Sequence, residues 1–184
     1  MITIRRLTEL DRGALQRIIT GYVAHETYRV RWQETDDGAH FALERTPLDQ
    51  PYIRQYDPLD DETVARYQAL VEAGCSFGAY AGDALMGVAL AEPHWWNRSL
   101  WVWEFHVAQP YRGQGFGARL MAALVEEASA AGLRTVVCET QNTNAPAVRF
   151  YRKVGFRVEG IDLSYYSNED FPDGEVAIFL KRRL

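Results

Sequence analysis

Cysteine and histidine are scarce in this chain, and neither is arranged to bind a metal. The 184 residues include two cysteines, Cys75 and Cys138, which lie in separate apolar segments without metal-ligand spacing. The four histidines are scattered and form no ligand pair. We therefore expect no metal site, and we expect the cysteines to be buried, reduced thiols of a cytoplasmic protein.

Long hydrophobic runs and a basic charge excess are also missing. No apolar run approaches the ~20 residues that span a bilayer, and Met1 to Arg6 lack the apolar stretch of a secretory signal. The formal net charge of −5 argues against a nucleic-acid partner and favours a cationic small molecule. Repeats, low-complexity tracts and linkers are absent, so we expect one domain over residues 1–184.

The most informative segment that is present is rich in glycine. Gly113, Gly115 and Gly117 alternate with other residues, directly after an apolar strand pattern over 100–107 and directly before an amphipathic helix pattern. Such a loop brings backbone N–H groups and the positive end of a helix dipole close to an anion. We therefore interpret it as a phosphate-binding loop, with a glycine-rich surface turn as the alternative.

Two common nucleotide motifs do not fit this loop. A P-loop requires Lys-Ser/Thr after its last glycine, but Ala118 and Arg119 stand there. A dinucleotide fingerprint requires a third glycine where this chain has Leu120.

The remaining pattern predicts an α/β fold. The expected strands cover 2–6, 76–81, 85–91, 100–107, 133–140, 156–163 and 175–181, with a turn at Gly82-Asp83. Helices are expected after Asp11 through Tyr22, over 64–71, from the glycine loop to Gly132, and from Asn144 to Gly155. Residues 29–61 appear irregular, with a short hairpin of 28–32 and 41–44. A mixed sheet follows, antiparallel in its first part, with a crossover helix between the strands near 105 and 136.

A second motif follows the glycine loop in the sequence. Asn144-x-x-Ala147-x-x-Phe150-Tyr151-x-Lys153-x-Gly155-Phe156 follows Arg112-x-x-Gly115-x-Gly117 after one helix and one strand. This pair of motifs resembles the GNAT superfamily of N-acetyltransferases. The resemblance implies a GNAT fold with a splayed central strand pair flanked by helices, and acetyl-CoA as co-substrate without a metal. The implied acetyl-CoA contacts are Phe105, His106, Val107, Arg112, Gly113, Gln114, Gly115, Phe116, Gly117, Ala118, Asn144, Ala147, Phe150 and Lys153.

A narrower resemblance extends from about residue 51 to the end. Trp96-Asn97-Arg98, Glu139-Thr140-Gln141 and Tyr166-Ser167-Asn168 are similar to segments of the streptothricin acetyltransferase group. Members of that group acetylate an amine of an aminoglycoside-like antibiotic, which implies an antibiotic-resistance activity. The chain departs from the group at Trp103-Glu104, where two adjacent acids are usual, and at His106, where a small residue is common. These departures concern the acceptor rather than the reaction.

The chemistry of acetyl transfer suggests roles for individual residues. By resemblance, Tyr151 is the general acid beside the thioester sulfur, whereas Phe150 better fits a packing role. Glu104 is either the general base or an anchor for the cationic substrate, and we expect its pKa to be raised among aromatic side chains. His106 is either a relay or a packing residue, and the backbone N–H groups of 105–107 are candidate oxyanion donors. The candidate acceptor-binding residues are Trp96, Trp103, Glu139 and Tyr166.

The sequence therefore predicts an acetyl-CoA-dependent N-acetyltransferase that acts on a primary amine of a small, cationic, streptothricin-like acceptor. Two alternatives remain: an acetyltransferase for protein lysines or polyamines, and a non-catalytic acyl-CoA-binding sensor. Other superfamily members dimerise, and nothing in the sequence decides between a monomer and a homodimer.

Overall fold

The computed structural model describes residues 1–184, which form two compact units. The first unit comprises Met1–Thr20, Gln55–Cys138 and Lys181–Leu184, and the second comprises Gly21–Arg54 and Glu139–Leu180. The expected mixed α/β sheet is confirmed: it has seven strands in the order β1-β4-β5-β6-β7-β9-β8, and a separate two-stranded sheet pairs β2 with β3. No helix has the length and apolar character needed to span a bilayer.

The strands of the first unit follow the predicted antiparallel order. These strands are β1 (Ile2–Arg6), β4 (Phe77–Ala81), β5 (Ala84–His94) and β6 (Ser99–Val107), and β7 (Thr135–Gln141) then runs parallel to β6. The ladder between β6 and β7 ends at the Val102–Cys138 pair. On the other side of β6, Leu90 lies opposite Glu104 and Ala91 opposite Val102. Trp103 is therefore an extra residue in β6, a bulge that changes the direction of the side chains after it.

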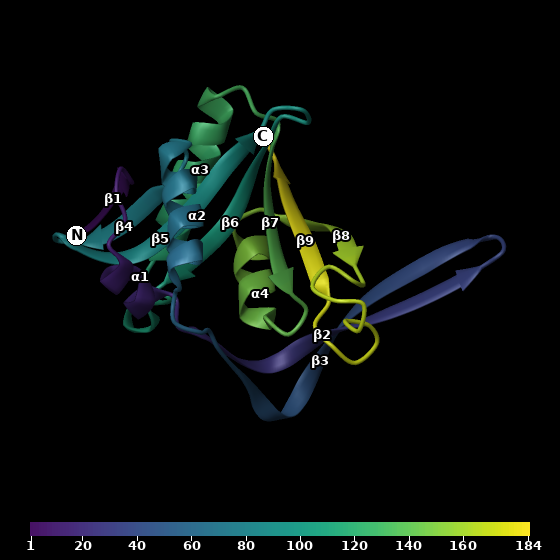
Figure 1. Ribbon diagram of the computed structural model, residues 1–184. Coiled ribbons are helices and arrows are strands. Elements are labelled where there is room, and N and C mark those ends of the chain that lie inside the picture. The colour runs from purple at the N-terminus through teal and green to yellow at the C-terminus, as the bar shows by residue number, and fades with distance from the viewer. The chain divides into compact units, whose positions relative to one another are not determined.

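Helices cover both faces of this part of the sheet (Figure 1). On one face, α1 (Arg12–Ile18) and α2 (Asp61–Glu72) pack on Val88 and Leu90 of β5 in a buried apolar core. The crossover helix α3 (Phe116–Ala130) follows a short 3-10 turn, η1 (Gln109–Tyr111). A Cβ at Gly87 would lie 3.0 Å from Leu120 of α3, so α3 packs on the face of β5 to which Gly87 points, opposite that of Val88 and Leu90.

The second unit contains the long hairpin of β2 (Gly21–Thr35) and β3 (Gly38–Gln55), helix α4 (Ala145–Lys153), β8 (Arg157–Asp162) and most of β9 (Ala177–Arg183). Asn142 holds these segments together with four hydrogen bonds. Its backbone and side chain bond Tyr28 of β2 at 2.9 and 3.0 Å, and likewise bond Val176 at 2.9 and 2.8 Å. One side chain therefore links the hairpin to the segment before β9.

Two expectations for residues 11–61 are wrong. The helix capped by Asp11 ends at Ile18 rather than Tyr22, because the chain turns at Gly21 with a φ of 109°, which favours glycine. The short hairpin expected at 28–32 and 41–44 is present, but it is part of the much longer β2–β3 hairpin, so the irregular structure expected around it is wrong. Pro47 and Pro51 do not prevent this, because a strand of a two-stranded ribbon has one side without a ladder and tolerates residues that lack an N–H.

Candidate functional site

The glycine loop of the first unit has the backbone that the sequence predicted. Gly113 and Gly115 have φ values of +77° and +92°, in the left-handed region that other residues rarely adopt. A Cβ at Gly113 would meet nothing within 4 Å, so the outer side of the loop is open. Gly115 is the N-cap of α3 and provides no side-chain cap.

The side chains of the loop hold its shape. Arg112 Nε donates to the Val107 carbonyl at 2.9 Å, and Gln114 Nε2 donates to the Pro110 carbonyl at 2.7 Å. The first helical hydrogen bond runs from the Arg119 N–H to the Gly115 carbonyl at 3.1 Å, so the amides of 116–118 lack intrahelical acceptors. An open glycine loop that leads into an uncapped helix N-terminus fits the pyrophosphate of acetyl-CoA.

A second group of polar residues in the first unit surrounds Glu104 of β6. The Tyr67 hydroxyl of α2 donates to Glu104 Oε1 at 2.5 Å, and His106 Nε2 lies 2.8 Å from Oε2. The ring of Tyr56 meets the His106 ring edge to face at a centroid distance of 5.8 Å. The expected proximity of Glu104 and His106 is confirmed, but sequence reasoning assigned no role to Tyr56 or Tyr67.

The expected direction of the Glu104 pKa is wrong. Burial does raise the pKa of this carboxyl, but the hydrogen bond and charge of His106 and the hydroxyl of Tyr67 outweigh burial. The net result is a pKa below its ordinary value, so Glu104 is a carboxylate at neutral pH. Burial and the neighbouring Glu104 together raise the pKa of the Tyr67 hydroxyl, which therefore keeps its proton and remains a donor.

The tryptophans of the first unit differ in their contacts and in their exposure to solvent. Trp103 contacts Trp101 at a centroid distance of 5.7 Å and donates from Nε1 to Glu92 at 2.9 Å. His94 stacks on the Trp101 ring at 5.6 Å. Trp96 lies in the turn between β5 and β6 and is 86% exposed. Of the two tryptophans predicted to bind the acceptor, Trp103 has ordered polar and aromatic contacts, whereas Trp96 projects into solvent.

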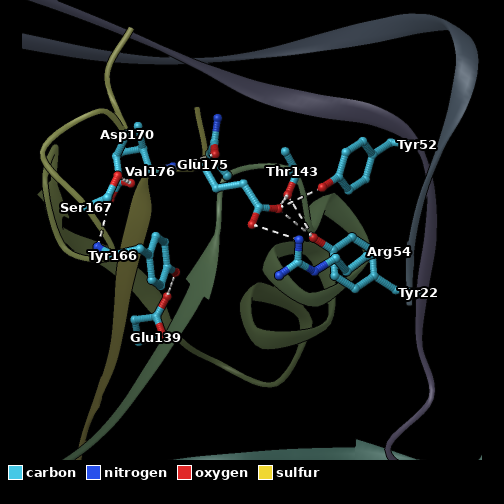
Figure 2. Close-up of polar contacts among 11 residues, drawn as sticks. Tyr22, Tyr52, Arg54, Glu139, Thr143, Tyr166, Ser167, Asp170, Glu175 and Val176 are labelled. Carbon is cyan, nitrogen blue, oxygen red and sulfur yellow. Dashed lines mark hydrogen bonds and ion pairs between the residues drawn. The ribbon is translucent and has the colours of Figure 1, made fainter. Parts of the chain in front are cut away.

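In the second unit, the predicted residues Glu139 and Tyr166 lie together (Figure 2). The Tyr166 hydroxyl donates to Glu139 Oε1 in a close contact. Asp170 accepts from the Tyr166 N–H and from the Ser167 hydroxyl, both at 2.7 Å, and so fixes the backbone of this loop. Burial, followed by the charge of Glu139, raises the pKa of Tyr166, which keeps the hydroxyl a donor.

Sequence reasoning missed a second carboxylate in this unit, that of Glu175 (Figure 2). Its Oε1 accepts from Thr143 at 2.7 Å, from Tyr52 at 3.0 Å and from Tyr22 at 3.5 Å. Its Oε2 lies 3.7 Å from Arg54 Nη1. These partners come from distant parts of the sequence, so no local pattern marks Glu175.

Helix α4 of the second unit begins as the sequence predicted. Asn144 is its N-cap, with Oδ1 accepting from the Ala147 N–H at 3.2 Å. Tyr151 is buried and contacts Phe150 and Phe156 at centroid distances of 5.5 and 5.7 Å. We expected Phe150 to be the residue that packs α4 onto the sheet. In the structure Phe150 is only half-buried and Tyr151 is more deeply buried, so Tyr151 also has a packing role.

The comparison with known proteins identifies the class to which this fold and loop belong. Residues 23–156 match the model of the acetyltransferase (GNAT) family. The chain belongs to this family and is an acetyl-CoA-dependent N-acetyltransferase.

Individual members of the family that resemble this chain have more specific activities. The chain is 33% identical to the streptothricin acetyltransferase of Streptomyces lavendulae over 92% of this chain and 88% of that protein. It resembles the crystal structure of a nourseothricin acetyltransferase with a TM-score of 0.79 and 29% identity, covering 99% of this chain and 98% of that one. It also shares the fold of a protein from Bacillus anthracis str. Ames solved with acetyl coenzyme A, at a TM-score of 0.74 and 23% identity over the full length of both chains. The predicted GNAT fold is confirmed.

Proposed function

We propose that this enzyme transfers the acetyl group of acetyl-CoA to a primary amine of a small cationic acceptor of the streptothricin type. The structural observation that carries the proposal is Glu104, a carboxylate on β6 that two neighbouring side chains hold in place and that stays ionised at neutral pH. Its charge suits an acceptor that arrives as an ammonium ion. The relationship to a streptothricin acetyltransferase over nearly the whole chain supports the acceptor class.

The glycine loop accounts for acetyl-CoA binding in this proposal. The amides of Phe116, Gly117 and Ala118 bind the pyrophosphate at the N-terminus of α3, and Gly113 and Gly115 allow its close approach. Arg112 and Gln114 support the loop through their hydrogen bonds to backbone carbonyls. The backbone of 105–107, beyond the end of the β6–β7 ladder, contacts the acetyl end and stabilises the oxyanion.

Tyr151 is proposed as the general acid that protonates the departing thiolate, with Asn144, Ala147, Phe150 and Lys153 of the same motif as further acetyl-CoA contacts. The family resemblance supports these roles. Replacing Tyr151 with Phe removes only the hydroxyl, so we expect turnover to fall while the Kd for acetyl-CoA stays unchanged. Unchanged turnover in Tyr151→Phe would refute the acid role. Tyr80→Phe, on β4 and without a proposed role, is the matched control.

In the first unit, Trp103 is proposed as an aromatic contact for the acceptor, with Trp96 as an exposed one. In the second unit, the Glu139–Tyr166 pair is proposed as a further acceptor contact. Carboxylates and aromatic faces are the groups that attract ammonium ions. Protein lysines and polyamines remain the alternative acceptors. The proposal places the enzyme in the cytoplasm, where buried thiols such as those of Cys75 and Cys138 stay reduced.

The deciding experiment measures CoA release from acetyl-CoA with streptothricin, aminoglycosides, polyamines and a lysine peptide. Turnover of streptothricin with none of the others supports the proposal and a role in antibiotic resistance. Turnover of another amine alone would keep the reaction and reject the acceptor. Acetyl-CoA binding without any turnover would contradict the proposal and favour an acyl-CoA sensor.

A further inference from the structure

The hydrogen bonds around Glu104 make it a poor direct base. Tyr67 donates to one carboxylate oxygen and His106 lies within hydrogen-bond distance of the other. These contacts stabilise the ionised form, and a carboxylate stabilised in this way has less tendency to take a proton. General base catalysis is most effective when the base titrates near the working pH, which is a property of imidazole rather than of a low-pKa carboxylate.

The same hydrogen bonds define the state of the His106 ring. An ionised carboxylate can only accept a hydrogen bond, so His106 Nε2 must carry the hydrogen that lies between it and Glu104 Oε2. In the neutral ring the lone pair then lies on Nδ1. The edge-to-face contact with Tyr56 holds the ring plane from a second side. These two contacts therefore hold the orientation of the His106 ring, and the tautomer that donates to Glu104 carries its lone pair on Nδ1.

We propose that His106 is the proton acceptor for the acceptor ammonium, and that Glu104 and Tyr67 are positioning residues that act through it. This inference rests on the proposed function. In the step, Nδ1 takes a proton from the ammonium, and the freed nitrogen lone pair forms a bond to the thioester carbonyl carbon. The carbonyl π electrons move onto oxygen as this bond forms, and the C–S bond breaks as the tetrahedral centre collapses. The sulfur leaves as a thiolate that the general acid protonates, and the second proton lost from the nitrogen passes through solvent to restore that acid. Glu104 stabilises the imidazolium that forms.

The charged and titratable groups around the Glu104–His106 pair come from two segments besides β6. Tyr67 and Arg66 of α2 act on Glu104, and Tyr56, which precedes α2, contacts the His106 ring. Replacing Glu104 with Gln removes the negative charge that favours the imidazolium. The acidic limb of the kcat/KM profile should then move to lower pH. Replacing Tyr67 with Phe removes a donor from Glu104, strengthens its interaction with His106, and should move that limb to higher pH.

The test is the pH dependence of kcat/KM for CoA release with acetyl-CoA and streptothricin, or the fastest amine of the panel. We expect His106→Gln to lower the rate by roughly 10²- to 10⁴-fold and to abolish the wild-type acidic limb, with the acetyl-CoA Kd unchanged. In His106→Ala, added imidazole should restore part of the rate. His94→Gln is the matched control, because His94 also pairs with a glutamate two residues away, Glu92, at 3.2 Å.

Several outcomes would overturn the inference. A wild-type acidic limb in His106→Gln would exclude His106 as the base, and so would shifts of the same sign in Glu104→Gln and Tyr67→Phe. These two variants also keep the test decisive if His106→Gln does not fold. A wild-type enzyme that turns over no amine overturns the proposed function itself. An active wild type with an unchanged His106→Gln profile rejects only the inference.

Discussion

The role of the glycine loop can be tested with two glycines whose backbones are alike but whose positions differ. Gly113 lies in the loop before α3 with a φ of +77°, and Gly132 follows the C-terminus of α3 with a φ of +70°. An added Cβ would meet nothing within 4 Å at either position. Alanine at either site therefore introduces backbone strain of roughly 1–2 kcal/mol without a steric clash. For a chain of this size, each kcal/mol lowers Tm by roughly 2–4 °C.

The two variants should differ in acetyl-CoA binding. Alanine at Gly113 disturbs the amides proposed to hold the pyrophosphate, and a hydrogen bond to a charged group contributes roughly 1.5–3 kcal/mol. Loss of one such bond weakens binding roughly 10- to 100-fold. We therefore expect Gly113→Ala and Gly132→Ala to lower Tm by similar amounts in scanning calorimetry. Isothermal titration should show an increased acetyl-CoA Kd only for Gly113→Ala. Equal Kd values in both variants would refute the assignment of the loop.

Three further predictions concern stability. Asn144→Ala should cost about 1 kcal/mol in urea unfolding, because the Ala147 N–H loses its cap; an unchanged midpoint would contradict the cap. Glu175→Ala should cost roughly 1–3 kcal/mol because it leaves donors without an acceptor. Glu175→Gln should cost less, since an amide carbonyl still accepts from Thr143 and Tyr52; equal losses would refute this account. Because the Glu104 pKa is lowered, its ionisation stabilises the fold at neutral pH, and this stability is lost as the pH falls below about 4.5. Circular dichroism should show that Glu104→Gln reduces the acid dependence of unfolding, and an identical acid transition would contradict the low pKa.

The sequence predicted those parts of the fold that depend on near neighbours. The strand of Ile2–Arg6, the turn at Gly82-Asp83 and the caps at Asp11 and Asn144 each follow from a few adjacent residues. A short hairpin was predicted within β2 and β3, but not its full length, because these strands alternate weakly and contain prolines. In addition, Tyr28 is fixed by Asn142 from a distant segment. A pattern among neighbouring residues cannot reveal a contact with a distant segment.

The same limit explains why the sequence placed Glu104 correctly but gave its pKa the wrong direction. Strand periodicity suggested that Glu104 and His106 share a face, and the hydrogen bond between them agrees. The sign of the pKa shift depends on a balance between burial, which the aromatic neighbours suggested, and donors, one of which is Tyr67 from a helix 37 residues earlier. That donor changes the interpretation of the site, because a carboxylate held by two neighbours orients and stabilises a base more readily than it serves as one. The variants of His106 and Glu104 show which of the two residues determines the acidic limb of the kcat/KM profile. That experiment therefore tests the contact between Tyr67 and Glu104 as well as the chemistry.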